Sequence, residues 1–293
     1  MPELPEVAAL AGALTDLAAG RVLAGADLAA ISVLKTFDPP LDACVGRTMV
    51  GVQRRGKFLC WQFDGGTWLV MHLARAGWLR WSPDVPATSA GPGRGPLMLR
   101  LVFVDADGAV AGRCDMTEAG TRKSSAVYVV GDPAQVPGIA RLGPDPLADD
   151  FTEDVFAQIV RRAGRSRLKG VLRDQGTIAG IGNAYSDEIL HAAGLSPFTS
   201  ADALGPQEVG LLYGHLREVL ADAVSRAGAA PMTSLKDAKR RHLQVHGRTG
   251  EPCPVCGDTI REVSYADSSL QYCPRCQTGG KLLADRRLSR LLK

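Results

Sequence analysis

The chain has 293 residues, of which 45% are hydrophobic, and its formal net charge at pH 7 is only +3. This length and apolar content allow about two folded domains with real cores and exclude a disordered chain. The sequence holds no apolar run near the roughly 20 residues of a membrane span, and its start lacks the basic and apolar stretches of a signal peptide. We therefore expect a folded cytoplasmic protein with no membrane partner.

Charge is distributed unevenly along the chain. Basic residues concentrate at 161–169, 236–248 and 281–293, while acidic residues gather at 145–154. Such clustering indicates a positive stripe on the second half, as nucleic-acid-binding proteins have, although solvated helix faces give the same pattern.

The first seven residues are Met1-Pro2-Glu3-Leu4-Pro5-Glu6-Val7. Once Met1 is removed, Pro2 carries a free secondary amine, which loses its proton at about pH 8 and can attack a sugar aldehyde carbon to form an iminium. Glu3 could then transfer protons. The alternative is purely structural, because prolines and glutamates of this kind also open a helix.

The first half of the chain is predicted to hold one helix and then strands. Apolar residues recur with a helical period from Leu4 to Ala18 and stop at Gly20. Five β-like runs then predict a mostly antiparallel region, at residues 48–52, 58–63, 68–73, 97–104 and 127–130. The stretch 82–96, rich in Pro, Gly and Ser, predicts a surface loop. Lys57 falls at the rim of a hairpin, where a solvated basic turn is the plain alternative.

The second half changes to helical sequence after a Gly-, Pro- and Asp-rich stretch at 137–150. With Thr152 as a candidate N-cap, the predicted helices are residues 153–162, 167–174, 183–193 and 206–226. Glycines at 176, 180 and 182 lie between the second and third of these helices. Backbone N–H groups at such turns can hold a phosphate, whereas an ordinary packing corner between two helices is the alternative. A polar, basic segment follows Met232.

Four of the seven cysteines cluster near the end of the chain, and the odd total argues against a disulfide framework. Two Cys-x2-Cys pairs, Cys253 with Cys256 and Cys273 with Cys276, have the spacing of a tetrahedral four-thiolate zinc site. Because all four ligands are protein side chains, we expect one structural Zn²⁺ that folds the module rather than a catalytic ion.

Taken in order, these features resemble the formamidopyrimidine-DNA glycosylase and endonuclease VIII family of base-excision-repair enzymes. The resemblance is carried by residues 1–7, 56–59, 72–73, 77–80, 142–147, 180–188, 247–256 and 273–277, and Leu4 favours the formamidopyrimidine branch. It implies an α+β multidomain fold, with an N-terminal helix and antiparallel β-sandwich, then a helical domain with a helix-two-turns-helix motif and a four-cysteine zinc finger. The implied parts are a catalytic domain (1–136), a linker (137–150), the helix-two-turns-helix domain (151–246), the zinc finger (247–277) and a basic extension (278–293).

The same resemblance implies a bifunctional DNA glycosylase and abasic-site lyase that acts as a monomer on damaged double-stranded DNA at the nucleoid. Pro2 would attack C1′ of the damaged nucleotide, with Glu3 as acid and base and Glu6 as a supporting carboxylate. After the base leaves, β- and δ-elimination would cut the strand on both sides of the lesion.

The DNA contacts that the resemblance implies lie in both halves of the chain. Lys57 would contact the lesion phosphate, Lys169 would line the damage site and Asn183 would bind phosphate. His72 and Arg75 are further predicted DNA contacts. Phosphate clamps of this kind would hold a kinked backbone while the damaged base is flipped out of the duplex.

Four features depart from the family pattern. Family members fill the space left by the flipped base with a methionine, an arginine and a phenylalanine. At the corresponding places this chain has Arg75 and the run 115–120. We expect Glu118 in this run to repel phosphates unless it pairs with a base or with Arg75. Ser268 stands where the zinc finger of the family carries a phosphate-binding arginine, for which Arg261 or Arg275 would have to compensate. The segment between Met232 and His242 looks shortened. The tail 281–293 extends past the usual end, and its leucines and arginines predict a short basic amphipathic helix.

Three hypotheses follow for function. An active glycosylase and lyase is the leading one, because Pro2 and Glu3 are intact. A lesion-binding protein of the same family with lost turnover is the second, because Ser268 and the residues that would fill the space left by the flipped base depart from the family pattern. A zinc-ribbon protein-interaction module unrelated to DNA leaves Lys57 and the glycine turn unexplained.

Overall fold

The computed structural model describes residues 1–83, 95–120, 123–265 and 268–284. The chain divides into two compact units: unit 1 is Met1–Arg141 with Val224–Leu235, and unit 2 is Leu142–Ala223 with Lys236–Lys293. Most of the predicted loop 82–96 lies outside the described residues, as do residues 285–293 of the predicted tail helix. The two units are described separately below.

Unit 1 begins with helix α1, Leu4–Ala18, where the sequence predicts it. The apolar positions of its helical period are buried, and they are Leu4, Val7, Leu10, Ala11, Leu14 and Ala18. Pro5 stands in the first turn, where its missing N–H costs no hydrogen bond. Gly20 follows the helix with a φ of +79°, in the left-handed region that favours glycine. Thr15 fixes the helix to a strand, because its Oγ1 accepts the Val52 N–H at 2.8 Å.

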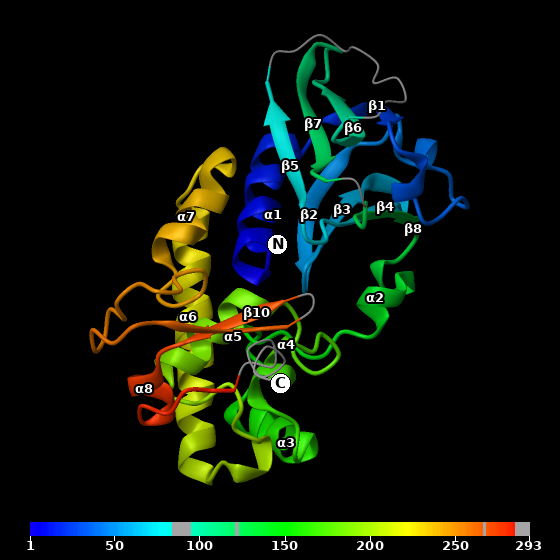
Figure 1. Ribbon diagram of the computed structural model, residues 1–293. Helices are drawn as coiled ribbons and strands as arrows, with labels where there is room; N and C mark the ends of the chain where they lie inside the picture. The colour runs from blue at the N-terminus through cyan, green and yellow to red at the C-terminus, as the bar shows by residue number, and fades with distance from the viewer. Residues whose placement is uncertain (84–94, 121–122, 266–267, 285–293) are drawn as a thin grey trace. The chain divides into compact units, whose positions relative to one another are not determined.

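Two four-stranded antiparallel sheets make up most of unit 1 (Figure 1). In spatial order the first holds β1 (Val22–Leu28), β6 (Leu97–Val104), β7 (Val110–Glu118) and β5 (Gly77–Ser82), and the second holds β2 (Met49–Arg55), β3 (Phe58–Phe63), β4 (Trp68–His72) and β8 (Ala126–Val130). Short helical pieces join them: η1 (Ile31–Val33), η2 (Leu41–Cys44), η3 (Asp64–Gly66), η4 (Pro133–Gln135) and α2 (Pro137–Ala140).

The two sheets share one apolar core. Trp61 of β3 and Phe103 of β6 are fully buried, and their rings stack with centroids 5.9 Å apart and planes 13° apart. A single cluster of buried residues joins both sheets, the inner face of α1 and Leu235. The predicted helix with an antiparallel β-sandwich is therefore confirmed.

Three observed strands, β1, β5 and β7, are missing from the strands that the sequence predicts. In β7 the inward positions hold Gly112, Cys114, Met116 and Glu118, which do not form an obvious apolar alternation. A Cβ on Gly112 would lie 2.2 Å from the Trp81 ring, so the indole takes the place of a side chain there. The apolar layer is completed by a neighbouring strand, which a search for alternation along one strand cannot detect.

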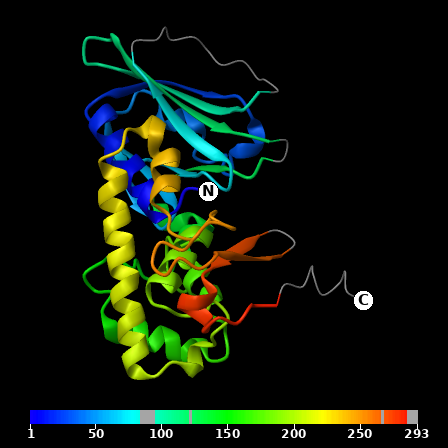
Figure 2. The ribbon, with the colours of Figure 1, turned by 60° about the vertical axis from the view of Figure 1, so that its left-hand side comes forward.

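Unit 2 is mainly helical (Figure 2). Its helices are α3 (Glu153–Ala163), α4 (Leu168–Arg173), α5 (Asn183–Ala192), α6 (Pro206–Gly228) and α7 (Leu235–His242), with the short turn η5 (Ala201–Ala203). The end of α6 from Val224 and the first residue of α7, Leu235, belong to unit 1. The four predicted helices are confirmed, and Thr152 caps α3 by accepting the Val155 N–H at 3.3 Å. Across the described parts of the chain, no helix combines the length and apolarity that crossing a bilayer requires.

The cysteine-rich end of unit 2 folds as a small ribbon. Strands β9 (Arg261–Ser264) and β10 (Ser269–Tyr272) pair antiparallel, and helix α8 (Pro274–Thr278) follows. Val263, Leu270 and Tyr272 form its own small apolar cluster, and β10 contacts α5.

Helix α6 leaves unit 2 and ends in unit 1. Val224–Leu235 belongs to unit 1 by its contacts, and Ala227 and Leu235 join the core of that unit. The segment after Met232, predicted only as polar and basic, forms η6 (Met232–Ser234) and helix α7. Leu235 and Ala238 are buried along α7, three residues apart, so this stretch of mostly charged side chains has one apolar face.

Candidate active site and zinc centre

The first turn of α1 holds two buried carboxylates beside Pro2. Glu3 is 2% exposed and Glu6 is 1% exposed, and the Glu6 Oε2 atom accepts the backbone N–H of Glu3 at 2.9 Å. This hydrogen bond satisfies one of the free donors of the helix start, and the positive end of the helix dipole favours both charges. Pro2 is itself buried while Met1 remains attached. The structure therefore brings Pro2, Glu3 and Glu6 together in one rigid turn.

Lys57 and His72 form a second group in unit 1. Gly56 and Lys57 make the tight turn between β2 and β3, as predicted, and Gly56 has a φ of +56°. On the next strand His72 pairs with Phe58, and the two rings lie 4.7 Å apart. Burial, and then the positive charge of Lys57, lower the pKa of His72 to about 4. His72 is therefore a neutral imidazole at pH 7 that can donate a hydrogen bond without carrying charge.

Arg75 stands exposed on the turn between β4 and β5. Ala74 beside it has a φ of +49°, the left-handed conformation that costs a residue with a Cβ about 1–2 kcal/mol. The turn is closed by the Gly77 N–H, which donates to the Leu73 carbonyl at 2.8 Å, and a Cβ on Gly77 would meet that oxygen at 2.2 Å. This strained turn presents Arg75 to solvent.

The run 115–120 offers no large exposed apolar side chain that could replace the methionine or phenylalanine of the family, and the prediction for Glu118 is wrong. Asp115 pairs with Arg100 at 2.8 Å within the sheet, and Met116 is a core residue. The Glu118 carboxylate is 1% exposed and accepts the N–H groups of Ser124 and Ser125 at 2.9 and 3.0 Å. Burial raises the pKa of Glu118, but these hydrogen bonds outweigh it and leave the pKa below its usual value. Glu118 closes its own loop instead of facing phosphates.

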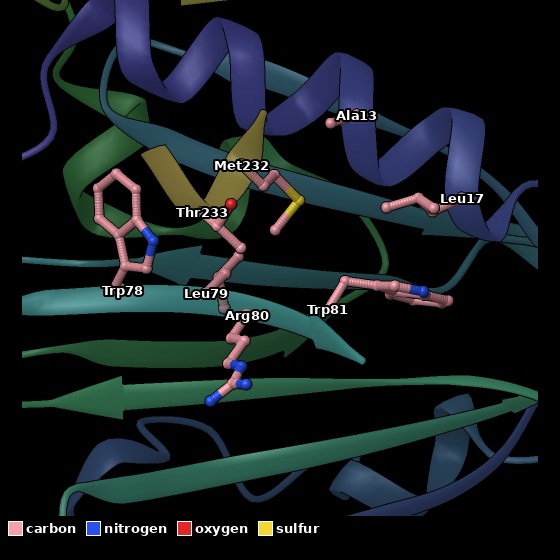
Figure 3. Close-up of a pocket in the computed structure, with 8 residues that line it drawn as sticks. All are labelled: Ala13, Leu17, Trp78, Leu79, Arg80, Trp81, Met232 and Thr233. Atoms are coloured by element: carbon pink, nitrogen blue, oxygen red, sulfur yellow. The ribbon is translucent and has the colours of Figure 1, made fainter. Parts of the chain in front are cut away.

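An apolar groove of about 380 Å³ also lies in unit 1, and it is separate from these residues (Figure 3). Its walls come from the later turns of α1, from β5 and from η6, and they hold Ala13, Leu17, Trp78, Leu79, Arg80, Trp81, Met232 and Thr233. The chemistry predicted for the chain belongs to the start of α1, so we do not assign the groove to the active site.

In unit 2, Asn183 is the first residue of α5, directly after the glycine turns. Side chains hold these turns: Gln175 accepts the Gly180 N–H at 3.0 Å and donates to the Ile181 carbonyl at 2.7 Å. The Asn183 Nδ2 donates to the Ser269 carbonyl of β10 at 2.7 Å, while its buried Oδ1 has no hydrogen-bond partner within the described parts of the chain. A buried amide oxygen left in this way could accept a hydrogen bond from a ligand or a water molecule.

Lys169 lies in a buried ion pair. Its Nζ donates to Asp187 Oδ1 at 2.6 Å, to Ser186 Oγ at 2.9 Å and to the Asn183 carbonyl at 3.1 Å. The other oxygen of Asp187 contacts His246 Nδ1 at 2.7 Å. Lys169 thus connects α4 to the first turn of α5. Its predicted contact with the damaged nucleotide stays a prediction, because these three acceptors already engage the ammonium group.

The four predicted zinc ligands lie together. The Sγ atoms of Cys253, Cys256, Cys273 and Cys276 are all within 4.8 Å of one another. Burial raises the pKa of Cys273 to about 11, and a hydrogen bond from the backbone lowers that of Cys256. Four thiolates this close are stable only around a cation, so this donor set fits a tetrahedral Zn²⁺. The backbone N–H of Cys276 points at Cys273 Sγ at 3.5 Å, as in a metal knuckle.

Ser268 lies at the hairpin of the ribbon, where its carbonyl accepts the Tyr265 N–H at 2.7 Å. Arg261 is exposed on β9, and the backbone N–H of Arg275 donates to Asp258 Oδ2 at 3.2 Å. The compensation expected from Arg261 or Arg275 therefore stays a prediction.

Four polar residues around α5 were not singled out from the sequence, and three of them, Asp187, Glu188 and His191, are buried. Asp187 and Glu188 follow the glycine turn, His191 lies one turn later, and His246 precedes the ribbon. Glu188 accepts three consecutive backbone N–H groups, those of Gln244, Val245 and His246, at 2.6 to 3.0 Å. The four-residue spacing of positions 183, 187 and 191 was a signal for one polar face on the predicted helix.

Three family models match the chain in order. Residues 1–121 match the formamidopyrimidine-DNA glycosylase N-terminal domain, residues 142–234 the formamidopyrimidine-DNA glycosylase H2TH domain, and residues 250–279 the zinc finger found in FPG and IleRS. A helix with a β-sandwich, a helix-two-turns-helix domain and a four-cysteine zinc finger together define a class of DNA-repair glycosylases.

Similar proteins agree with this class. A formamidopyrimidine-DNA glycosylase of Symbiobacterium thermophilum is 36% identical over 289 residues, covering 94% of this chain and 89% of its own length. An uncharacterized formamidopyrimidine-DNA glycosylase-like protein of Mycobacterium tuberculosis is 55% identical over 160 residues, which are 55% of this chain and 99% of that protein.

Solved structures match nearly the whole chain. The structure of MutM (FPG) from Thermus thermophilus superposes with a TM-score of 0.77 at 32% identity, over 96% of this chain and 100% of that one. Lactococcus lactis Fpg bound non-covalently to DNA containing an AP site superposes with a TM-score of 0.79 at 26% identity, over 94% of this chain and 99% of that one. The chain belongs to the formamidopyrimidine-DNA glycosylase family, whose members are DNA glycosylases and AP lyases of base-excision repair, and its finger holds one structural zinc ion.

Proposed function

We propose that this chain excises damaged, oxidised bases from double-stranded DNA through a Schiff base on Pro2. The observation that carries the proposal is the buried first turn of α1, which joins Pro2 to two carboxylates. Removal of Met1 converts the Pro2 nitrogen from an amide into a secondary amine. A substantial share of this amine is unprotonated near neutral pH, because the pKa of an α-amino group is about 8.

The reaction runs in balanced steps. The Pro2 nitrogen bonds to C1′ and loses its proton while the bond from C1′ to the base breaks, and the departing base takes up a proton. The C1′–O4′ bond then breaks as the sugar oxygen is protonated, which leaves an iminium between Pro2 and C1′. The resulting iminium acidifies C2′, so loss of a C2′ proton expels the 3′ phosphate and a second elimination expels the 5′ phosphate. Water then hydrolyses the imine and restores Pro2. Glu3 is the acid and base for these proton transfers, and Glu6 orients it by holding its backbone N–H at 2.9 Å.

The remaining predicted residues bind DNA in this proposal. Lys57 places its charge at the hairpin turn, His72 offers a neutral donor beside it and Arg75 stands exposed on its strained turn. In the other unit Asn183 binds a phosphate at the start of α5 by donating the Nδ2 hydrogen that Ser269 does not engage, and Lys169 orders that turn. We further propose that the protein acts as a monomer on chromosomal DNA in the cytoplasm.

Borohydride trapping tests the chemistry. Duplex DNA with one abasic site is incubated with the protein, whose loss of Met1 is first checked by mass spectrometry, and the imine is reduced to a stable adduct. We expect an adduct with the wild type and none with Pro2→Gly, while Pro5→Ala, which alters the neighbouring proline, still forms it.

Two outcomes would contradict the proposal. Adduct formation by Pro2→Gly would show that the secondary amine of Pro2 is not required. Tight, salt-dependent binding to lesion DNA with no adduct and no strand cleavage would favour the second hypothesis, a lesion-binding protein without turnover. The departure from the family pattern at Ser268 is the observation that supports this hypothesis.

A further inference from the structure

His191 is a buried histidine that the proposed reaction does not use. It lies on the last turn of α5 and is 6% exposed. Its Nε2 atom is 3.3 Å from the Sγ of Cys253, one of the four zinc ligands. An imidazole nitrogen and a metal-ligand sulfur at this distance are in hydrogen-bond contact.

The direction of this hydrogen bond follows from the chemistry of the sulfur. A cysteine bound to zinc is a thiolate, which has no proton to donate and carries negative charge. His191 must therefore donate its Nε2–H to Cys253. Four thiolates around one Zn²⁺ leave a net charge of −2, and a donor that faces one sulfur reduces the charge density at that ligand.

The same face of α5 carries two more contacts to the ribbon. Asn183, Asp187 and His191 are spaced four residues apart and so lie in one row along the helix. Asn183 donates to the Ser269 carbonyl at 2.7 Å, and the Asp187 Oδ2 accepts the Gln271 N–H at 3.3 Å. We call these three side chains the α5 row. The α5 row contacts the ribbon at three points along the helix, and His191 is the residue of the row that contacts a zinc ligand.

We infer that His191 is an outer-sphere ligand of the zinc site. By donating to the Cys253 thiolate, this positioning residue slows loss of zinc and links metal occupancy to the row that holds Asn183. Residues of this kind orient metal ligands, and their loss typically lowers metal affinity by about 10- to 100-fold. The inference does not depend on the proposed glycosylase chemistry, since it concerns only the metal site.

Zinc retention in three purified variants tests this role. His191→Phe removes the donor but keeps a planar ring, His191→Gln keeps an N–H donor of similar reach, and His215→Phe changes a histidine of α6 that pairs with Glu218 on a partly exposed face. We expect a chelator with a metal-indicator dye to remove zinc about tenfold or more faster from His191→Phe than from the wild type. His191→Gln and His215→Phe should stay close to the wild type.

A spectroscopic measurement separates the hydrogen bond from a purely packing role. In the Co²⁺-substituted protein, the sulfur-to-metal charge-transfer band should move to longer wavelength in His191→Phe, because a thiolate without its donor gives up charge more easily. His191→Gln should restore the band. Wild-type zinc release with an unshifted band in His191→Phe would overturn the inference, and so would a His191→Gln variant that behaves like His191→Phe.

If His191→Phe does not fold, the wild-type protein still provides a test. Loading with an NMR-active cadmium isotope should produce a scalar coupling between the metal and the His191 ring N–H, transmitted through the Cys253 sulfur. Absence of that coupling in a folded, fully loaded protein would equally overturn the inference.

Discussion

At the scale of single residues, His72 should set how the stability of unit 1 depends on pH. Its pKa in the folded protein is lowered to about 4 by burial and by Lys57, from an unfolded value of 6.5. Between these values the unfolded chain binds one more proton than the folded chain, so stability falls as the pH is lowered. The unfolding equilibrium should shift by up to tenfold, or about 1.4 kcal/mol, per pH unit.

The distribution of histidines and tryptophans allows the effect of His72 to be measured separately. His72 is the single histidine in residues 1–141 and 224–235, and all four tryptophans, Trp61, Trp68, Trp78 and Trp81, lie in the same unit. Urea unfolding followed by tryptophan fluorescence at pH 6.5 and pH 5 should show the loss in the wild type and little of it in His72→Gln. An equal slope in both proteins would assign the effect to carboxylates instead.

At the same scale, the sequence predicted the positions of residues better than their partners. Glu3 at a helix start, Lys57 in a hairpin turn and the four clustered cysteines lie where short local motifs predict them. The role of Glu118 does not, because its carboxylate turns inward to backbone groups six and seven residues later. Charge alone suggested an outward position, whereas the hydrogen bonds available in the loop outweighed the cost of burial.

At the scale of elements, the buried pair of Lys169 and Asp187 should contribute far more to stability than an exposed pair of the same length. The two joined atoms are 2.6 Å apart, and the side chains are 7% and 0% exposed. Asp187→Asn removes the charge that pairs with the buried Lys169 ammonium, so we expect a loss of about 3–5 kcal/mol in the free energy of unfolding. Circular dichroism of urea unfolding measures it.

The matched control is the ion pair of Arg248 and Glu251, whose atoms are 2.7 Å apart but whose side chains are 35% and 51% exposed. Glu251→Gln should cost less than about 1 kcal/mol, because water screens the pair. Similar losses in the two variants would show that burial does not decide the strength of these pairs.

Helix α5 shows why elements were predictable while their contacts were not. Its limits followed from the glycine turn before it and from Gly194 after it, and the structure ends it at Ala192, within one residue of the prediction. The burial of its polar row depends on partners far along the chain, such as His246, which is 59 residues from Asp187. Without a known position for the ribbon, Asp187 and His191 are ordinary helix surface residues.

At the scale of the whole molecule, each unit has a core of its own. The core of unit 1 joins two sheets and α1, whereas the apolar cluster next to the zinc ligands contains only Val245 and Ile260 besides the cysteines, among the residues that the structure describes. Even together with the cluster of Val263, Leu270 and Tyr272, this apolar surface is too small to fold the ribbon without metal, so zinc supplies much of the free energy that orders it. Loss of zinc should therefore lower the stability of unit 2 and leave the stability of unit 1 unchanged.

This difference gives a test of independence between the units. After zinc is removed by a chelator, or in Cys253→Ser, we expect the urea midpoint from tryptophan fluorescence to stay at the wild-type value, because all four tryptophans report on unit 1. Affinity for abasic-site duplex should fall at least about tenfold, because the ribbon no longer holds Asn183 through Ser269. A protein sample that is exposed to the chelator but keeps its zinc serves as the control. If the fluorescence midpoint drops together with the zinc content, unit 1 depends on the ribbon for its stability and the two units fold as one.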